Sequence, residues 1–538
     1  MPIIETGLNS GSDAFRRNRA AMLEKIERVR ALEARTRERS ADSRALFEKR
    51  GQLLPRERLA RLLDPGAPWL ELSTLAGFCL DHPDPEKSVP GGGCITGIGY
   101  VSGARCMMVA SDSGIDAGAF QTMGLDKMLR AQAIAATNKL PFVHLVESAG
   151  ANLLKYRVES FLRGGAVFCN LARLSAAGIP VITVVHGSST AGGAYMPGMS
   201  DYVVMVRGRA RAFLAGPPLL KAATGETATE EELGGAEMHA QVSGLAEYLA
   251  EDDADAVRIA REILAQLAWG TAAPPPAEFR APRHPAEELL GLIPADYRKP
   301  LDMREVIARI ADDSAFLEFK AGYGPATVTG HASIQGHGCG IVTNNGPLDP
   351  AGSSKATHFI QSCCQAGLAL VYLQNTTGYI VGREPEQAGM IKHGAKMIQA
   401  VSNANVPQIT IMCGASFGAG NYGMCGFGYQ PRFLFSWPNA RTAVMGAEQA
   451  ATTMAIVTEA SMKRKGQEAD PAVIGDLRRR IVETFERQSS ALDISALMLD
   501  DGVIDPRDTR NVIGFTLSIC REAQHRRLRP VQFGVARP

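Results

Sequence analysis

The chain has 538 residues, of which 45% are hydrophobic and 21% charged. A single core rarely grows beyond about 300 residues, so this length predicts two large domains or more. The formal net charge of +1 excludes the strong positive field that a general nucleic-acid binder carries. The 10 Cys form no CxxC pair, which disfavours a zinc ribbon and indicates free thiols in a reducing cytosol.

Leader and membrane segments are not expected from the sequence. The start MPIIETGLNSGSDAFRRNR lacks the apolar core of a signal peptide, and no long uninterrupted apolar stretch occurs. We therefore expect a cytoplasmic protein with neither a membrane nor a nucleic acid as partner. No His, Asp and Glu cluster has metal-ligand spacing, so we expect no metal site.

The first elements in chain order are helical. Residues 14–50 are rich in Arg, Glu and Ala, with Leu and Met at helical spacing. They predict an exposed helical arm over 1–50, for which packing on a partner subunit and plain solvation stay equally open. An N-terminal domain is predicted next, over 51–269. It begins with RGQLLPRERLARLLDPGAPWLELS, which predicts a helix closed by DPG and then a strand.

A proline-rich stretch divides the chain near its middle. The segment GTAAPPPAEFRAPRHPAEE, Gly270–Glu288, excludes helix and sheet alike because its prolines lack the backbone donor that both require. We predict a linker over 270–300 and a C-terminal domain over 301–538.

The two halves resemble each other in sequence. LPFVHLVESAGAN and IPVITVVHGSSTAGGAY in the first half match LALVYLQNTTGYI and VPQITIMCGASFGAGNY in the second. Pro180 and Pro407 differ by 407 − 180 = 227, and the same offset joins Tyr195 to Tyr422. This agreement predicts a duplicated α/β unit in which short β-branched strands alternate with helices.

Each copy carries a glycine-rich turn after a buried strand, TAGGAY in the first and FGAGNY in the second. Glycine lets the backbone approach a ligand closely, and a helix starting there adds unpaired N–H donors and a positive dipole end. These are the parts of an oxyanion hole, which stabilises negative charge on a carbonyl oxygen. Two such turns predict two carbonyls, one per domain, whereas close helix–strand packing is the structural alternative.

Other motifs fit their chemistry less well. GASFG, Gly414–Gly418, matches a nucleophile elbow, but only His525 follows Ser416 and it lies in a basic tail. GIGYVSG fails the dinucleotide spacing, and GPPLLKAATGE lacks the GK[ST] of a P-loop. Lys396 in GAKM is interpreted as a helix-surface or anion-binding lysine rather than a biotinylation site. His144 and His186 are expected to be structural.

The motifs GSSTAGGAYMPGMSD, FLAGPPLLKAATGE, LGGAEMHAQVSG and GASFGAGNYGMCG resemble the carboxyltransferase (beta) subunits of biotin-dependent acyl-CoA carboxylases. The resemblance runs from RGQLLPRERLARLLDPG to GVIDPRDTR, nearly the whole chain. It implies two tandem crotonase-type (ClpP/crotonase) domains of the ββα-superhelix kind. It also implies a homo-hexameric core, and an alpha subunit that supplies the biotin carboxylase and the covalently attached biotin.

The resemblance assigns roles to the turns. Amides near Gly192 and Gly193 face the thioester carbonyl of the acyl-CoA, and amides near Ala419 and Gly420 face the ureido carbonyl of carboxybiotin. The carboxyl group then passes to the γ carbon of a branched, unsaturated acyl-CoA through enolates held in the two holes, with no side-chain base. Further expected positions are, for substrate, Gly150, Gly164, Gly165 and Ala194, and, for biotin, Thr377, Gly378, Tyr379 and Gly418.

The acyl chain is predicted from one position. The resemblance is greatest to methylcrotonoyl-CoA and geranoyl-CoA carboxylases, and the former carry a Phe where RGGAVF has Gly164. The missing ring leaves room for a longer isoprenoid tail, which favours geranoyl-CoA. The alternatives are methylcrotonoyl-CoA with Gly164 merely tightening a turn, a non-catalytic scaffold subunit, and a crotonase-type hydrolase acting alone.

Overall fold

The computed structural model describes residues 1–119, 121–149, 158–294, 296, 299, 301–468 and 470–535. The chain divides into two compact units. The N-half unit comprises residues 31–274, 496–498 and 519–538, and the C-half unit comprises residues 1–30, 275–495 and 499–518. The predicted limits at 50, 269 and 300 stay predictions.

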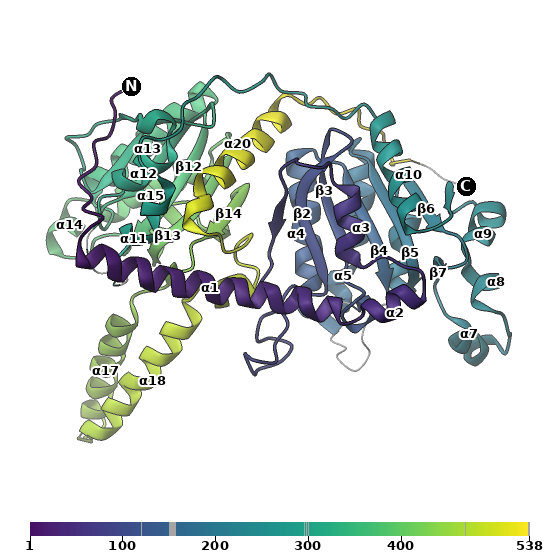
Figure 1. Cartoon of the computed structure of the whole chain (residues 1–538). Coiled ribbons are helices and arrows are strands. Elements are labelled where there is room, and N and C mark those ends of the chain that lie inside the picture. Colours follow the sequence, from purple (N-terminus) through teal and green to yellow (C-terminus); the bar gives the residue numbers. More distant parts are fainter. Residues whose placement is uncertain are drawn as a thin grey trace. The chain divides into compact units, whose positions relative to one another are not determined.

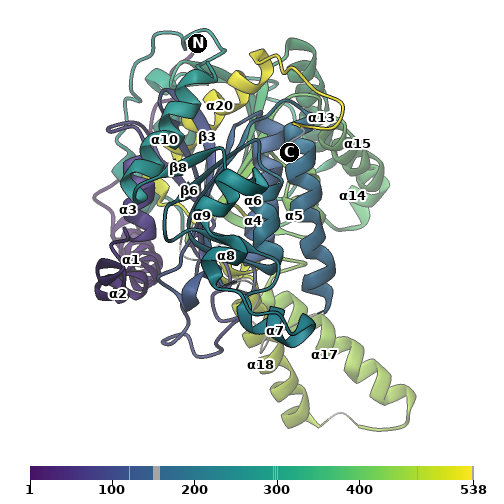
Figure 2. The same ribbon diagram turned by 90° about the vertical axis from the view of Figure 1, so that its right-hand side faces the viewer.

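The N-half unit contains a mixed sheet in the order β1-β2-β3-β4-β5-β6-β8, with β7 paired to β5. Helices α4 and α5 lie on one face of this sheet, and α3 and α10 on the other (Figure 2). The strands are β1 Leu70–Leu72, β2 Cys94–Val101, β3 Ala104–Ser111, β4 Phe142–Ser148, β5 Val181–Thr190, β6 Tyr202–Val206, β7 Arg211–Phe213 and β8 Tyr248–Ala250; the helices are α2 Arg44–Lys49, α3 Pro55–Leu62, α4 Gly124–Asn138, α5 Val158–Ala176, α6 Tyr195–Gly198, α7 Pro217–Thr224, α8 Glu230–Gly234, α9 Ala236–Met238 and α10 Asp253–Gln266.

The C-half unit repeats this arrangement with the sheet order β14-β13-β12-β11-β10-β9 and β15 paired to β13. Figure 1 shows α13 and α15 beside its strands, and the α17–α18 hairpin projecting from this unit. The strands are β9 Leu317–Glu318, β10 Thr327–Ile334, β11 His337–Asn344, β12 Ala369–Thr376, β13 Gln408–Phe417, β14 Phe433–Ser436 and β15 Arg441–Ala443; the helices are α11 Leu289–Leu292, α12 Arg304–Ile310, α13 Pro350–Ala366, α14 Arg383–Gln387, α15 Met390–Ser402, α16 Ala419–Gly423, α17 Ala447–Arg464 and α18 Pro471–Gln488. Helices α1 Asp13–Ala41, α19 Ala491–Ala496 and α20 Thr509–His525 contain residues of both units.

The two sheets confirm the predicted duplicated α/β fold. In each sheet an antiparallel β-hairpin is followed by parallel strands. Parallel strands need a crossover connection, and helices form these connections here. The repeat also extends further toward the N-terminus than the sequence indicated. RERLARLLD on α3 matches REVIARIAD on α12, and Arg56 and Arg304 both bind a carboxylate of the first strand, Glu71 and Glu318 respectively.

The N-terminal helix corrects one expectation. We predicted an exposed arm over 1–50, but α1 buries the face formed by Phe15, Met22, Ile26, Val29 and Leu32. These residues recur every three, four or seven positions, the spacing of an amphipathic helix. One face of this helix therefore packs within the chain itself, and packing of its outer face on a partner subunit stays a prediction.

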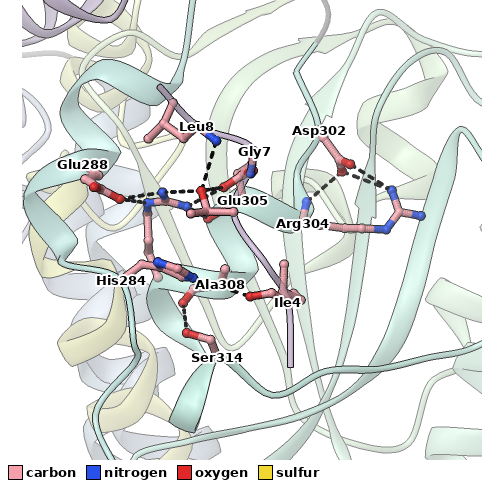
Figure 3. Close-up of polar contacts among 12 residues, drawn as sticks. Ile4, Gly7, Leu8, His284, Glu288, Asp302, Arg304, Glu305, Ala308 and Ser314 are labelled. Carbon is pink, nitrogen blue, oxygen red and sulfur yellow. Dashed lines mark hydrogen bonds and ion pairs between the residues drawn. The ribbon is translucent and has the colours of Figure 1, made fainter. Parts of the chain in front are cut away.

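The segment before this helix is anchored on α12 of the C-half unit (Figure 3). Glu305 accepts hydrogen bonds from Thr6 Oγ1 and the Gly7 amide, each 2.7 Å long. Arg309, whose side chain is fully buried, binds both Glu305 and Glu288. A buried guanidinium needs such paired carboxylates, since leaving it unpaired would cost several kcal/mol. These contacts attach the segment before α1 to α12.

Asp500 in the C-half unit predicts a measurable pH dependence of stability. It is 3% exposed, and burial raises its pKa from 3.8 to about 7. Because the folded state binds the proton more tightly than the unfolded state, stability falls as the pH rises from about 4 to 7 and stays lower above that. Asp500→Asn keeps an acceptor for the Gly502 amide. We expect it to stabilise the protein by up to about 4 kcal/mol at pH 8.

Thermal melting of wild type and Asp500→Asn from pH 4 to pH 8 checks this prediction. The melting temperature of the variant should exceed that of wild type at pH 8, and the gap should close toward pH 4. A gap that does not change with pH would show that Asp500 is not protonated in the folded state.

Candidate active site

The first glycine turn comes directly after β5. Residues Ala191–Ala194 form a 3-10 turn that leads into the single helical turn α6. Gly192 is exposed and Gly193 buried, while the Ser189 hydroxyl donates a 2.8 Å hydrogen bond to the Gly193 carbonyl. The buried Ser189 hydroxyl therefore holds the Gly193 carbonyl, while the backbone of Gly192 is open to solvent.

The second glycine turn comes after β13 in the same way. Ala419 is exposed and Gly420 is buried, as Gly192 and Gly193 are in the first turn. Both residues open α16, and the first amides of any helix have no acceptor within it. We expected a helix dipole to assist both turns, but α6 has four residues and α16 five. The macrodipole of such short helices is small, so the amide groups themselves are the main donors.

Backbone conformation repeats between the two turns. A positive φ stands just before the exposed residue of each turn: 52° at Ala191, before Gly192, and 54° at Gly418, before Ala419, with 418 − 191 = 227 residues between them. Glycine adopts this conformation freely, whereas alanine does so at a cost of roughly 1–2 kcal/mol. Strain retained at a non-glycine residue marks a position where the local geometry is needed.

The second turn lies against the loop after β12. A Cβ on Gly420 would stand 2.8 Å from the Gly378 Cα and 3.0 Å from Thr376 Cγ2, so two backbones meet there with no room for a side chain. Thr377 is exposed beside them. Tyr379 is half-buried next to Gly423 and Gly394, and burial raises its pKa well above the ordinary range. We call the backbone around the second turn, formed by Thr377, Gly378, Tyr379 and Gly418, the cradle. Its shape suits a group that presents a carbonyl oxygen.

Helix α5 lies beside the first turn. The Phe168 ring packs edge-to-face on Tyr195 at 5.7 Å, and its Cζ is 3.8 Å from where a Cβ on Gly192 would stand. Gly164 precedes Phe168 by four residues, so the two share a helix face. A Cβ on Gly164 would meet nothing within 4 Å. The alternative that Gly164 tightens a turn is wrong, since it lies inside α5.

The remaining expected positions lie close to these two turns where the structure describes them. Gly165 is exposed beside Gly164, and Ala194 is half-buried at the end of the first turn. Gly150 lies outside the described residues. The structure thus puts Gly192, Gly193 and Ala194 on one turn, Gly164 and Gly165 on the neighbouring helix, and the four predicted biotin positions around the second turn.

The rejected motifs are structural. Ser416 is fully buried, where its hydroxyl donates to Gln374 and accepts from Asn421, so no nucleophile is presented. His144 lies within β4, and burial lowers its pKa to about 3. Burial also lowers the pKa of His186, which contacts Asp253. Lys396 is exposed on α15, as expected.

Comparisons with known proteins agree with this geometry. The model of the carboxyl transferase domain family matches residues 47–532. A probable biotin-dependent acyl-coenzyme A carboxylase beta2 subunit of Mycobacterium tuberculosis is 51% identical over 87% of this chain and 88% of its own. A probable mitochondrial methylcrotonoyl-CoA carboxylase beta chain of Drosophila melanogaster is 46% identical over 91% and 87%.

A solved structure is similar over nearly its whole length. The crystal structure of the beta subunit of P. aeruginosa geranyl-CoA carboxylase has 54% sequence identity and a TM-score of 0.93, covering 99% of this chain and 100% of that one. The similarity agrees with the predicted pair of crotonase-type domains. Among the described residues, no helix has the length and apolar character of a membrane span, and no group of His, Cys, Asp and Glu has the arrangement of a metal site.

Proposed function

The chain belongs to the carboxyl transferase domain family, as a beta subunit of the biotin-dependent acyl-CoA carboxylase type, and on that premise we propose that it carboxylates the γ carbon of geranoyl-CoA. The similarity to the geranyl-CoA carboxylase beta subunit is the observation that carries this proposal. The open space at Gly164, one helical turn from the Phe168 ring that packs on Tyr195 beside the first turn, supports it independently. The CoA thioester is the substrate, and biotin arrives on the partner alpha subunit.

The first turn is proposed to bind the thioester. Amides at Gly192 and Gly193 donate hydrogen bonds to the thioester oxygen, where negative charge develops once the γ carbon loses its proton. Ser189 restrains the Gly193 carbonyl and so keeps the turn in one conformation. Ala194 and Gly150 complete the acyl site in this proposal. Because the donors are fixed before the reaction, no reorganisation is needed as the charge appears.

The second turn is proposed to bind the ureido carbonyl of biotin. The cradle formed by Thr377, Gly378, Tyr379 and Gly418 holds the ring, and the amides of Ala419 and Gly420 face its oxygen. The backbone contact between Gly420 and Gly378 fits such a group because any Cβ there would fill the space. When bound, biotin supplies the carboxyl group that is transferred. The chain's own residues orient the ring and stabilise charge on its oxygen.

The same proposal implies two kinds of partner. An alpha subunit carries the biotin carboxylase and the biotin carrier, and a homo-hexamer of this chain forms the core, in the cytoplasm. A scaffold subunit would not require two intact turns, and a hydrolase acting alone would not require the second. Carboxylation that depends on the biotinylated partner distinguishes the proposed function from both.

Methylcrotonoyl-CoA is the second candidate substrate, supported by the 46% identity to a methylcrotonoyl-CoA carboxylase beta chain. Gly164→Phe separates the two. Geranoyl-CoA has five more carbons, whose burial contributes about 0.8 kcal/mol each before ordering costs. A Phe ring would occupy that space and displace the carbonyl from its donors. We expect the kcat/KM ratio of geranoyl-CoA to methylcrotonoyl-CoA to fall at least tenfold.

The matched control is Gly475→Phe, since Gly475 also lies inside a helix, α18, with nothing within 4 Å of its Cβ position. It should leave the ratio unchanged. An unchanged ratio in Gly164→Phe would remove Gly164 from the acyl site. A wild-type ratio that favours methylcrotonoyl-CoA would overturn the choice of geranoyl-CoA.

A further inference from the structure

The ladder between β4 and β5 is irregular just before the first turn. Val146 pairs with Val185, but the next pair joins Ser148 to Ser189. Glu147 alone therefore faces the three residues 186–188 of β5. Such irregularities bend a strand and redirect the chain beyond them. Here the redirected part of β5 is the part that leads into Ala191–Ala194.

The Glu147 carboxylate fills the space beside this irregular stretch. It is 8% exposed and accepts hydrogen bonds from Arg58 at 2.6 Å, Ser113 at 2.9 Å and Gln52 at 3.0 Å. A Cβ on Gly187 would lie 2.5 Å from its Oε1, so Gly187 has to be glycine because the carboxylate stands there. Burial raises the pKa of Glu147, but Arg58 and the hydrogen bonds lower it overall, so the group is ionised.

Arg58 ties this carboxylate to three further elements. It lies on α3, is 2% exposed, and its Nε donates a 2.9 Å bond to Asp253 at the start of α10. Asp253 in turn lies 2.9 Å from His186 Nδ1 on β5, while Gln52 donates to the His186 carbonyl at 3.2 Å. These contacts hold β4 and β5 together where the register of the ladder shifts.

The C-half unit has the same irregularity without the charges. Gln374 pairs with Met412 and Thr376 with Ser416, and Asn375 stands where Glu147 does, 375 − 147 = 228 residues later. A Cβ on Gly414 would lie 2.4 Å from Asn375 Oδ1, and Asn439 donates to the Cys413 carbonyl as Gln52 does to that of His186. The repeat places Val306 at the Arg58 position. The two ladders share this register shift, but the Arg58–Glu147 ion pair of the N-half unit is replaced by Val306 and Asn375 in the C-half unit.

We propose that Arg58 and Glu147 are a positioning pair for the turn Ala191–Ala194, and that they act on the acyl-CoA half of the reaction alone. The inference rests on the proposed function for the assignment of the two turns. The pair sets the path of β5 past the irregularity, Ser148 then pairs with Ser189, and Ser189 bonds the Gly193 carbonyl. A displacement of about 1 Å at such a turn can reduce the rate a hundredfold.

Glu147→Gln tests the pair, because it preserves the shape and removes the charge. Two reactions are measured with the biotinylated partner: carboxylation of geranoyl-CoA, and loss of the carboxyl group from carboxybiotin without any acyl-CoA. We expect kcat for carboxylation to fall at least tenfold, with KM for geranoyl-CoA and the rate of carboxyl loss each within twofold of wild type. Glu147→Asp, which keeps the charge, should recover part of the lost kcat.

Asp64→Asn is the matched control. Asp64 also pairs with an arginine, Arg261, and binds the Ser102 and Gly103 amides, but at the β2–β3 hairpin, where the parallel strands begin, whereas Glu147 lies where they end. It should leave both reactions near wild type. If Glu147→Gln lowers the melting temperature enough to prevent assay, Arg58→Lys keeps the charge and loses the Nε bond, and its loss should again be confined to carboxylation.

Equal losses in both reactions, a loss in carboxyl release alone, or no loss at all would each overturn the inference while leaving the proposed function in place. Wild-type protein that carboxylates no acyl-CoA with the partner present would instead overturn the proposed function, and the positioning role with it.

Discussion

Gly193→Val should lower carboxylation of the acyl-CoA at least a hundredfold while the protein stays folded. The Cβ of a valine at this position would lie 3.3 Å from the Ser189 Oγ that holds the Gly193 carbonyl, so the branched side chain displaces the turn and its amides. One lost donor in an oxyanion hole raises the barrier by about 3–4 kcal/mol. The fold should tolerate the change, because Gly193 has no left-handed φ and its Cβ would meet only the Ser189 hydroxyl, at 3.3 Å.

The experiment measures kcat/KM for geranoyl-CoA with the biotinylated partner, together with carboxyl loss from carboxybiotin in the absence of acyl-CoA. Only the first should change. Gly198→Val is the control: it lies five residues further on, in α6, and its Cβ would meet nothing within 4 Å. Turnover near wild type in Gly193→Val would refute the assignment of this turn to the thioester.

Gly420→Ala should have the complementary effect. A single methyl group there would stand 2.8 Å from the Gly378 Cα, closer than real Cβ atoms approach another heavy atom, and 3.0 Å from Thr376 Cγ2. Either the α16 amides or the loop 376–379 has to move, and the cradle for the ureido group loses its geometry. We expect carboxyl loss from carboxybiotin without acyl-CoA to slow by about a hundredfold, from the loss of one donor.

Carboxylation of acyl-CoA should fall by the same factor, since the carboxyl group has to leave biotin before it is transferred. The control is Gly428→Ala, where the Cβ position is open. A Gly420→Ala protein that discharges carboxybiotin normally and fails only on acyl-CoA would show that the two turns have been assigned to the wrong groups.

The sequence alone determined the features that depend on residues close together in the chain or on a constant repeat offset. Three features can be recognised without coordinates: the apolar strand before each turn, the glycines of the turns, and the offset of 227 residues between Pro180 and Pro407. They can be recognised because strand periodicity and the conformational freedom of glycine are local properties. They were sufficient for the duplicated α/β fold and for the family. The exclusion of the Ser416 elbow likewise needed only the order of residues along the chain.

The tertiary structure decided what depends on strand order and helix packing. The Phe168 ring packs on Tyr195 because α5 lies beside the first turn, which no local pattern shows. The match of α3 to α12 does not follow from the repeat of the turns, because its offset is 304 − 56 = 248 residues rather than 227. The pair Arg58 and Glu147, 89 residues apart, forms only when the helix and the strand end are brought together in a buried space. Long-range contacts of this kind arise from register and burial, which local sequence patterns do not encode.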